Sequence, residues 1–114
     1  MNKTEVVVVL GKVGFDDRIT YVSPSVKDLF GYEPGELIGI NVKQVLTPQS
    51  YLKQREGMER AMGENSTKTD ILMVEVIKKN GEKVPVEICA RFDRDADGNM
   101  VGILGTAKVV KITF

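Results

Sequence analysis

Residues 76–87 read Val-Ile-Lys-Lys-Asn-Gly-Glu-Lys-Val-Pro-Val-Glu, and this stretch decides the fold class of the 114-residue chain. Asn80-Gly81 is a dipeptide that supplies the positive φ angles of a tight hairpin turn. On both sides of the turn, apolar and polar side chains alternate with the period of two that is typical of a half-buried strand. The sequence therefore predicts a β-hairpin whose first strand covers residues 69–77.

The same alternation continues toward the C-terminus. Val84, Val86, Ile88 and Ala90 form one series of alternate residues after the turn, which predicts that they share one face of the next strand. Asp-Ala-Asp-Gly at 95–98 is a second turn signal, and a last strand is predicted over residues 100–112. Three consecutive antiparallel strands are therefore expected in the second half of the chain.

The first half predicts a second hairpin followed by helices. Residues 6–10 are Val-Val-Val-Val-Leu, a strand pattern that is apolar on both faces, so we expect this strand to lie centrally and to be covered on both sides. A turn at 15–17 leads to a second strand over 18–22. The complete order, two strands, several short helices and three strands, predicts an α+β domain with an antiparallel sheet.

Three proline-containing pairs mark the helix starts. Ser23-Pro24 predicts a short helix with the serine as its N-cap, and Glu33-Pro34 predicts a second one. Thr47-Pro48 opens a longer helix that is expected to reach about Met62.

Composition excludes several classes of function. Sixteen basic and sixteen acidic residues cancel, so the basic surface that nucleic acid requires is not expected. No apolar run approaches the roughly 20 residues of a membrane helix, and no secretory leader opens the chain, so we expect a cytoplasmic segment without membrane contact. The chain has no histidine, which removes the usual general base and the commonest metal ligand.

An enzymatic function is not expected of this chain. The carboxylates of Asp16, Asp17 and Glu36 fall in turns and helix starts, with no histidine, lysine or metal cluster predicted beside them. Since serine–histidine and cysteine–histidine pairs are impossible here, no catalytic residue and no metal site are predicted.

Several segments, taken in order, resemble a PAS domain. Residues 18–26 (Arg-Ile-Thr-Tyr-Val-Ser-Pro-Ser-Val), 29–32 (Leu-Phe-Gly-Tyr) and 36–39 (Glu-Leu-Ile-Gly) look like its first half. The hairpin at 76–87 and the turn and strand at 97–103 look like its second half. The resemblance implies a five-stranded antiparallel sheet with short helices packed on one face.

The resemblance also implies a role. Such domains belong to sensor kinases, cyclic-dinucleotide enzymes and transcription regulators, where they bind a small ligand or mediate dimerisation. We therefore expect a non-catalytic sensory and dimerisation module of a two-component sensor histidine kinase, binding a small, mostly apolar ligand. The alternatives are a purely structural interaction module without a ligand, or the PAS domain of a cyclic-dinucleotide enzyme or a transcription regulator. Residues 1–114 are expected to be one domain of a larger signalling protein, with flanking signalling helices, an output domain and a possible membrane anchor elsewhere in that protein.

Cofactor chemistry is restricted by the same comparison. Flavin photoreceptor members carry a reactive cysteine just after Gly-x-Asn, whereas here Gly39-Ile40-Asn41 is followed by Val42 and the single cysteine is Cys89. A cysteinyl-flavin adduct is thus excluded, and so is a histidine-ligated haem. The absence of tryptophan and the scarcity of polar pocket candidates argue against a non-covalent flavin, so no cofactor is expected.

Three sets of site residues are predicted. The set chosen by inward phase as ligand-pocket walls comprises Phe30, Ile40, Leu46, Met58, Met62, Ile88 and Ile103. An ion pair between Glu36 and either Lys78 or Lys79 is predicted to link the second short helix to the hairpin. Leu104, Val110 and Ile112 share the other face of the last strand with one side of residues 6–10. Because helices cover only one face, we expect this face to mediate a homodimer or to bind a flanking helix.

Overall fold

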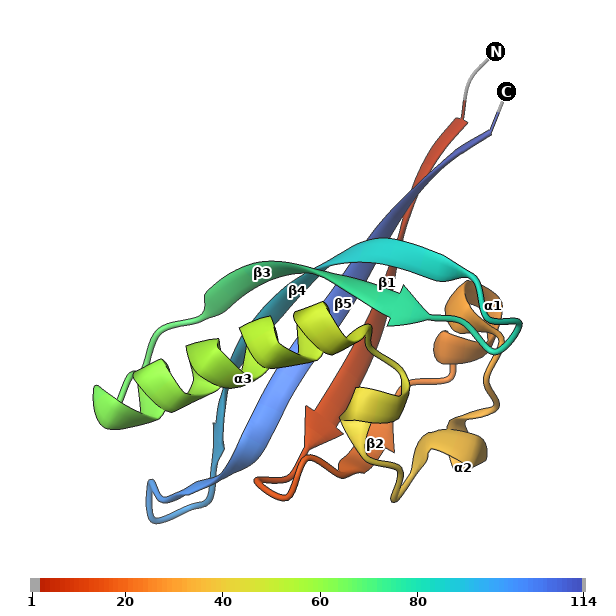
Figure 1. The fold of residues 1–114 in the computed structure, drawn as a ribbon. Coiled ribbons are helices and arrows are strands. Elements are labelled where there is room, and N and C mark those ends of the chain that lie inside the picture. The colour runs from red at the N-terminus through yellow and green to blue at the C-terminus, as the bar shows by residue number, and fades with distance from the viewer. Residues whose placement is uncertain (1–2, 114) are drawn as a thin grey trace.

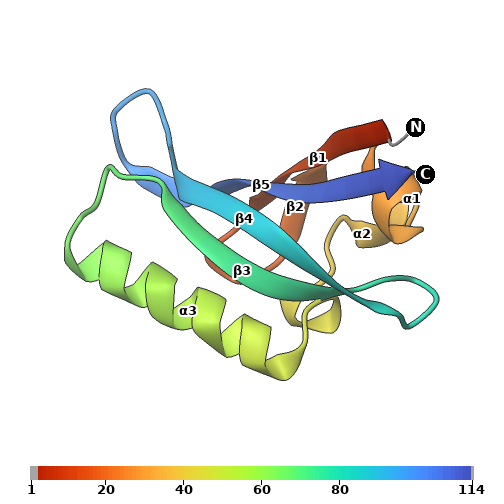
Figure 2. The same cartoon turned by 90° about the horizontal axis from the view of Figure 1, so that it is seen from above.

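The computed structural model describes the backbone of residues 3–113 and the side chains of residues 4–109. Five antiparallel strands form one sheet in the order β2-β1-β5-β4-β3. The strands are β1 (Lys3–Val13), β2 (Ile19–Val22), β3 (Asp70–Ile77), β4 (Lys83–Arg94) and β5 (Met100–Thr113). The helices are α1 (Val26–Phe30), α2 (Pro34–Leu37), the 3-10 helix η1 (Val42–Gln44) and α3 (Pro48–Gly63). All of them lie on one face of the sheet, which confirms the predicted α+β architecture (Figures 1 and 2).

The β3–β4 hairpin closes as predicted, but through a slightly different turn. Of the Asn80-Gly81 pair, only Gly81 has a positive φ, at 89°. The Lys78 N–H donates to the Glu82 carbonyl at 2.8 Å, and the Glu82 N–H donates to Asn80 Oδ1 at 2.9 Å. The loop is therefore a three-residue connection with glycine in the left-handed position, and not a two-residue turn with two positive φ angles.

The first helix begins two residues later than predicted. Ser25, and not Ser23, is the N-cap of α1. Ser23 Oγ instead accepts a hydrogen bond from the Leu10 N–H at 2.9 Å, and the Ser23 N–H donates to the Leu10 carbonyl at 2.8 Å. Ser23 thus forms two hydrogen bonds with Leu10 of β1. This is a long-range contact, and the local sequence around Ser23 does not predict it.

The other two helix starts lie where the proline pairs place them. α2 begins at Pro34 with Glu33 as N-cap, and its start is held by a reciprocal capping box in which Glu36 Oε1 accepts from the Glu33 N–H at 2.9 Å. α3 begins at Pro48 and ends at Gly63.

The hydrophobic core lies between the helices and the inner face of the sheet. Alternate residues of the paired strands point toward the helices, for example Val9, Val74 and Val86. From the helical layer, Val26, Leu29, Phe30, Leu37 and Leu46 complete the core. This arrangement follows from the period of two in the strands and the short apolar stripes of the helices.

The prediction that residues 6–10 are covered on both sides is wrong for this chain alone. Val9 on the inner face is buried, whereas Val6, Val8 and Leu10 on the outer face are 54%, 44% and 37% exposed. β1 is the second strand of the sheet, and its neighbour β2 pairs only with residues 11–13. The reason is the one-sided helical layer, which leaves the outer face of the sheet uncovered (Figure 2).

The two ends of the described chain lie side by side. β1 pairs with β5 from Lys3 opposite Thr113 to Val13 opposite Ile103. The pairing of β4 with β5 begins only at Lys108, so the outer part of the β1–β5 pair extends beyond the other strands as a two-stranded ribbon (Figure 1).

Candidate functional site

A cavity of about 200 Å³ lies between α3 and the inner face of the sheet. Small residues on both sides create it: Gly57 and Ala61 on α3 face the sheet, and Ala90 and Gly105 lie on β4 and β5. A Cβ atom added to Gly57 would meet no atom within 4 Å. The space is therefore a consequence of missing side-chain volume, in a layer that apolar side chains otherwise fill.

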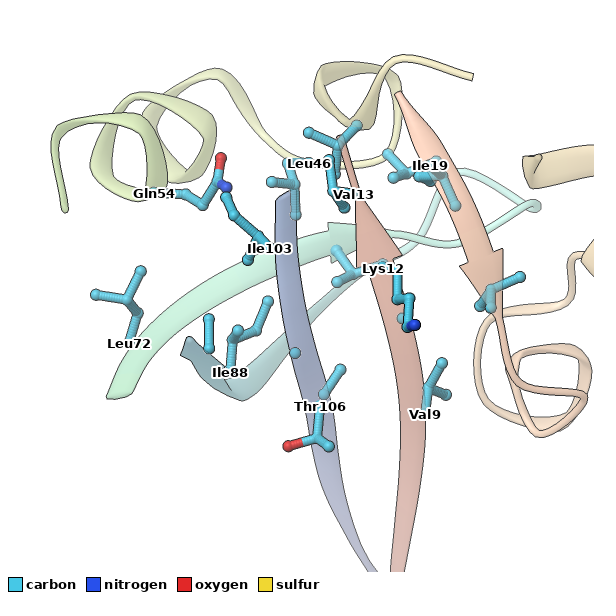
Figure 3. Close-up of a pocket in the computed structure, with 18 of the residues that line it drawn as sticks. Val9, Lys12, Val13, Ile19, Leu46, Gln54, Leu72, Ile88, Ile103 and Thr106 are labelled. Carbon is cyan, nitrogen blue, oxygen red and sulfur yellow. The ribbon is translucent and has the colours of Figure 1, made fainter. Parts of the chain in front are cut away.

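Most of the predicted pocket residues lie in the wall of this cavity. Figure 3 shows part of the wall, including Leu46, Ile88 and Ile103. The predicted residues that line it are Phe30, Leu46, Met58, Ile88 and Ile103. Because these side chains come from the helical layer, β4 and β5, a molecule held here would contact both layers of the domain.

Two predicted pocket residues lie elsewhere. The inward phase assigned to Met62 is wrong, because its side chain is 43% exposed near the end of α3. Ile40 packs against the core but does not line the cavity, since it lies in the connection between α2 and η1, where its carbonyl accepts from the Ile19 N–H at 2.9 Å.

Gln54 is a wall residue that the sequence did not single out. It lies on α3, three residues before Gly57 and four before Met58, and therefore on the same helix face. Its Oε1 is buried and has no hydrogen-bond partner among the described residues. Figure 3 shows the side chain extending from α3 toward the side of the cavity where Ile103 lies. A buried amide without a partner is unusual in a native domain, and the sequence signal, one glutamine in a helix with many polar residues, is too common to reveal it.

The predicted ion pair forms between α2 and the β3–β4 hairpin. Lys79 Nζ lies 2.8 Å from Glu36 Oε1, whereas Lys78 pairs with Glu82 at 3.1 Å within the hairpin. The hydrogen bond from Lys79, together with the capping bond from the Glu33 N–H, lowers the pKa of Glu36 below its ordinary value. The Lys79 N–H also donates to the Phe30 carbonyl at 2.9 Å, so the hairpin is attached to the helical layer at two points.

A second polar contact joins the β1–β2 turn to α3. Asp17 is only 4% exposed and has a positive φ of 65°. Its Oδ2 accepts hydrogen bonds from the Tyr51 hydroxyl and from Arg55 Nη1, the latter at 2.9 Å. The hydrogen bond to the Asp17 carboxylate raises the pKa of Tyr51. Asp17 therefore has a positioning role in the fold, because it fixes the first half of α3 against the sheet beside the cavity.

The outer face of the sheet carries the third predicted set. Leu104 pairs laterally with Lys12 on β1 and Arg91 on β4, and its side chain is half-buried on this face. The side chains of Val110 and Ile112 lie outside the described residues. Cys89 also belongs to the outer face, opposite Thr106, and does not line the cavity.

Within residues 3–113, no helix is both long enough and apolar enough to cross a membrane.

An antiparallel five-stranded sheet with a one-sided layer of short helices and an apolar cavity beneath the longest helix defines a small two-layer α+β domain. The sequence profile of the PAS domain family matches residues 6–108, which is nearly the whole chain, and the protein belongs to this family. PAS domains are sensory modules of signalling proteins and are generally non-catalytic. A search of curated proteins finds no matching relative.

Solved structures with the same fold include PAS domains of different proteins. A PAS domain from Colwellia psychrerythraea superposes with a TM-score of 0.76 at 17% identity, covering 88% of this chain and 83% of that one. The N-terminal domain of a diguanylate cyclase with a PAS/PAC sensor from Marinobacter aquaeolei gives a TM-score of 0.70 at 13% identity, covering 89% and 93%. A light-oxygen-voltage domain studied with a flavin analogue gives 0.67 at 24% identity, covering 91% and 76%.

Proposed function

We propose that this PAS domain is a non-catalytic sensor that binds one small, mostly apolar molecule in the cavity beneath α3. The observation that carries the proposal is the cavity itself, about 200 Å³ in volume and lined mainly by apolar side chains. An apolar cavity of roughly 150 Å³ is enough to hold benzene. The expected ligand is therefore about the size of one substituted ring.

The cavity wall suggests how occupancy would be transmitted. Met58 belongs to α3 and Ile103 to β5, so a ligand touching both would change the contact between helix and sheet. Leu104, the next residue of β5, lies on the outer face. If the ligand binds more tightly to the domain at one distance between α3 and the sheet than at another, it shifts the population toward that distance. β5 then carries the change to the outer face.

The test is a titration of the methyl-labelled domain with toluene, followed by NMR. Methyl signals of Met58, Ile88 and Ile103 should shift, while the exposed methyl of Met73 on the outer face should not. The variant Gly57→Leu, which places a side chain in the cavity, should abolish the shifts. Absence of shifts in the wild-type domain at the solubility limit of toluene would refute the ligand-binding function.

A homodimer through the outer face is a second function, favoured by the exposed side chains of β1. Val6, Val8 and Leu10 point away from the helices and are contiguous along one strand. Exposed apolar residues in such a row are typical of an interface, and the same face on a second copy provides a matching surface.

Sedimentation velocity tests the dimer. We expect the wild-type domain to associate, and Val8→Asp and Leu104→Asp to shift it to monomer. Met73→Asp, which introduces the same charge on the same face but on the far edge strand β3, is the matched control and should leave association unchanged. A wild-type domain that stays monomeric at millimolar concentration would exclude this interface as a self-association site.

We further propose that the complete protein is a sensor histidine kinase of a two-component system, in which this domain lies in the cytoplasm and passes its signal through flanking helices to an output domain. The similarity to the PAS/PAC sensor of a diguanylate cyclase supports a cyclic-dinucleotide enzyme as the alternative host, and a transcription regulator is a third. The reading frame that follows Phe114 in the gene decides among these hosts, since the output domain would be encoded there.

We propose that the domain holds no haem or flavin. Cys89 lies on the outer face of the sheet and not in the cavity wall, so it cannot reach a ring bound there. The cavity is also below the roughly 300–1,000 Å³ that ligand pockets usually offer to larger molecules. The purified domain should therefore show no visible absorption band, and a flavin or haem spectrum that copurifies with it would contradict this proposal.

A further inference from the structure

We propose that Gln54 anchors the cavity ligand by hydrogen bonding, and that the ligand is an uncharged, single-ring-sized molecule carrying one hydroxyl or comparable polar group. This inference rests on the proposed ligand-binding function and specifies the chemistry of that site.

The first observation is the unsatisfied amide of Gln54. Its Oε1 is buried and has no partner among the described residues, although the side chain forms part of the cavity wall. A buried polar group without a partner is unfavourable by an amount comparable to a lost hydrogen bond. Rotation about the last side-chain bond exchanges the oxygen and the nitrogen, so the amide can offer either an acceptor or a donor to a ligand. A hydroxyl group on the ligand can pair with the Gln54 amide in either orientation, because a hydroxyl both donates and accepts hydrogen bonds.

The second observation is that the other polar groups along the wall are already used or face solvent. The Tyr32 hydroxyl donates to the Ile77 carbonyl at 2.7 Å. Lys12 Nζ lies 3.7 Å from Asp93, an outer-face partner. The charged residues of the wall are all exposed, and they are Lys12, Lys68, Asp70 and Arg91. Thr106, opposite Cys89, and Tyr21, opposite Lys12 and 42% exposed, belong to the outer face of the sheet. Among the described wall residues, Gln54 is thus left as the buried polar group available to a molecule inside the cavity.

The third observation is that no charged residue of the described cavity wall is buried. The buried carboxylate beside the cavity, Asp17, does not line it and is paired with Arg55 at 2.9 Å. A carboxylate or ammonium group placed among these apolar side chains would lose its hydration without gaining an ionic partner. The site therefore selects neutral molecules, and the single amide selects those with one polar group.

Three probes that share a ring and a methyl group test the inference: toluene, p-cresol and p-toluate. Their dissociation constants are measured by NMR titration for the wild type, for Gln54→Met and for Gln49→Met. Methionine keeps the length of glutamine and removes its hydrogen-bonding groups. Gln49 is an exposed residue of the same helix outside the cavity wall, so its substitution is the matched control.

The decisive quantity is the dissociation constant of p-cresol divided by that of toluene. A hydroxyl is better hydrated in water than a hydrogen, and this hydration is the same for every variant. A change in the ratio between variants therefore reports the contact that the hydroxyl makes in the cavity. Gln54→Met should raise this ratio by about three- to tenfold, the loss of one hydrogen bond. Gln49→Met should leave it unchanged. In the wild type, p-toluate should bind at least about tenfold more weakly than p-cresol, because its charge has no partner.

The possible results separate the two levels of the proposal. Toluene binding with a ratio that Gln54→Met leaves unchanged would overturn the role of Gln54 while the ligand-binding function stands. Tighter binding of p-toluate than of p-cresol would overturn the uncharged class. If neither toluene nor p-cresol binds to the wild type, the ligand-binding function fails and the anchor fails with it. Thermal melts of Gln54→Met provide a fold check, and we expect no loss of stability because an unpartnered polar group has been removed.

Discussion

Filling the cavity from Gly57 should stabilise the domain and at the same time remove its binding site. Gly57 lies in the interior of α3, and a Cβ atom there would contact nothing within 4 Å. Glycine in the middle of a helix is about 1 kcal/mol less favourable than alanine. Gly57→Ala should therefore raise the free energy of unfolding by about 1 kcal/mol, a shift of roughly 4 °C in Tm for a domain of this size.

A larger side chain at the same position should add to this gain. Leucine has three more carbons than alanine, and each buried CH₂ group contributes about 0.8 kcal/mol, or about 2.4 kcal/mol together. Ordering the side chain opposes this by about 0.5–1 kcal/mol. We therefore expect Gly57→Leu, with its side chain in the open space beneath α3, to be more stable than the wild type by about 2.4–2.9 kcal/mol.

Guanidinium unfolding and thermal melts measure the stability, and the toluene titration measures the loss of binding. Gly63→Ala is the control, because Gly63 also has open space around it but lies exposed at the last position of α3, away from the cavity. It should change stability less and leave toluene binding intact. A destabilised Gly57→Ala would refute the reasoning, since it would mean that the space beside Gly57 is already filled in solution.

The remaining predictions concern the two polar contacts around the core. Asp17→Asn should lower Tm by several degrees, because Tyr51 and Arg55 lose a charged acceptor. Asp17→Ala should lower it further, because alanine tolerates the positive φ of this position less well than asparagine does. The lowered pKa of Glu36 means that its pairing with Lys79 stabilises the fold fully above the ordinary value of 4.5 and is lost as the pH falls through the lower folded-state value. The Tm difference between the wild type and Glu36→Gln should therefore shrink from neutral pH to about pH 3, and a difference that grows on acidification would contradict the direction of this shift.

Local chemistry was enough to predict the elements and the fold class. The alternation around Gly81 predicts the hairpin, because a period of two is a property of neighbouring residues in one strand. Pro34 and Pro48 mark helix starts for the same reason, since their fixed φ acts on the chain at that point. The helix start predicted at Ser23 was wrong, because the Ser23 side chain forms a long-range hydrogen bond with Leu10 and does not cap the helix.

The pocket could be predicted only in part. Five of the predicted wall residues line the cavity. Their inward orientation could be predicted because the apolar periodicity of each element is present in its own sequence. The phase of Met62 was misassigned, because Met58 and Ala61 face the cavity from α3 whereas the side chain of Met62 is 43% exposed. Asp17 was considered only as a possible catalytic carboxylate, since its contacts with Tyr51 and Arg55 join residues more than thirty positions apart.

The sequence by itself determined that this chain is an α+β domain with an antiparallel sheet, because strand alternation, turn residues and caps act between near neighbours. The PAS type and its one-sided helical layer came from the resemblance of its ordered motifs to that family. Only the tertiary structure decided that Gly57 and Ala61 face small residues of the sheet and leave a cavity. It also decided that Oε1 of Gln54 is buried beside that cavity and has no hydrogen-bond partner within the described part of the chain. The volume of a cavity and the satisfaction of a buried polar atom depend on which distant segments meet. That meeting is set by the packing of the whole domain and not by any one segment.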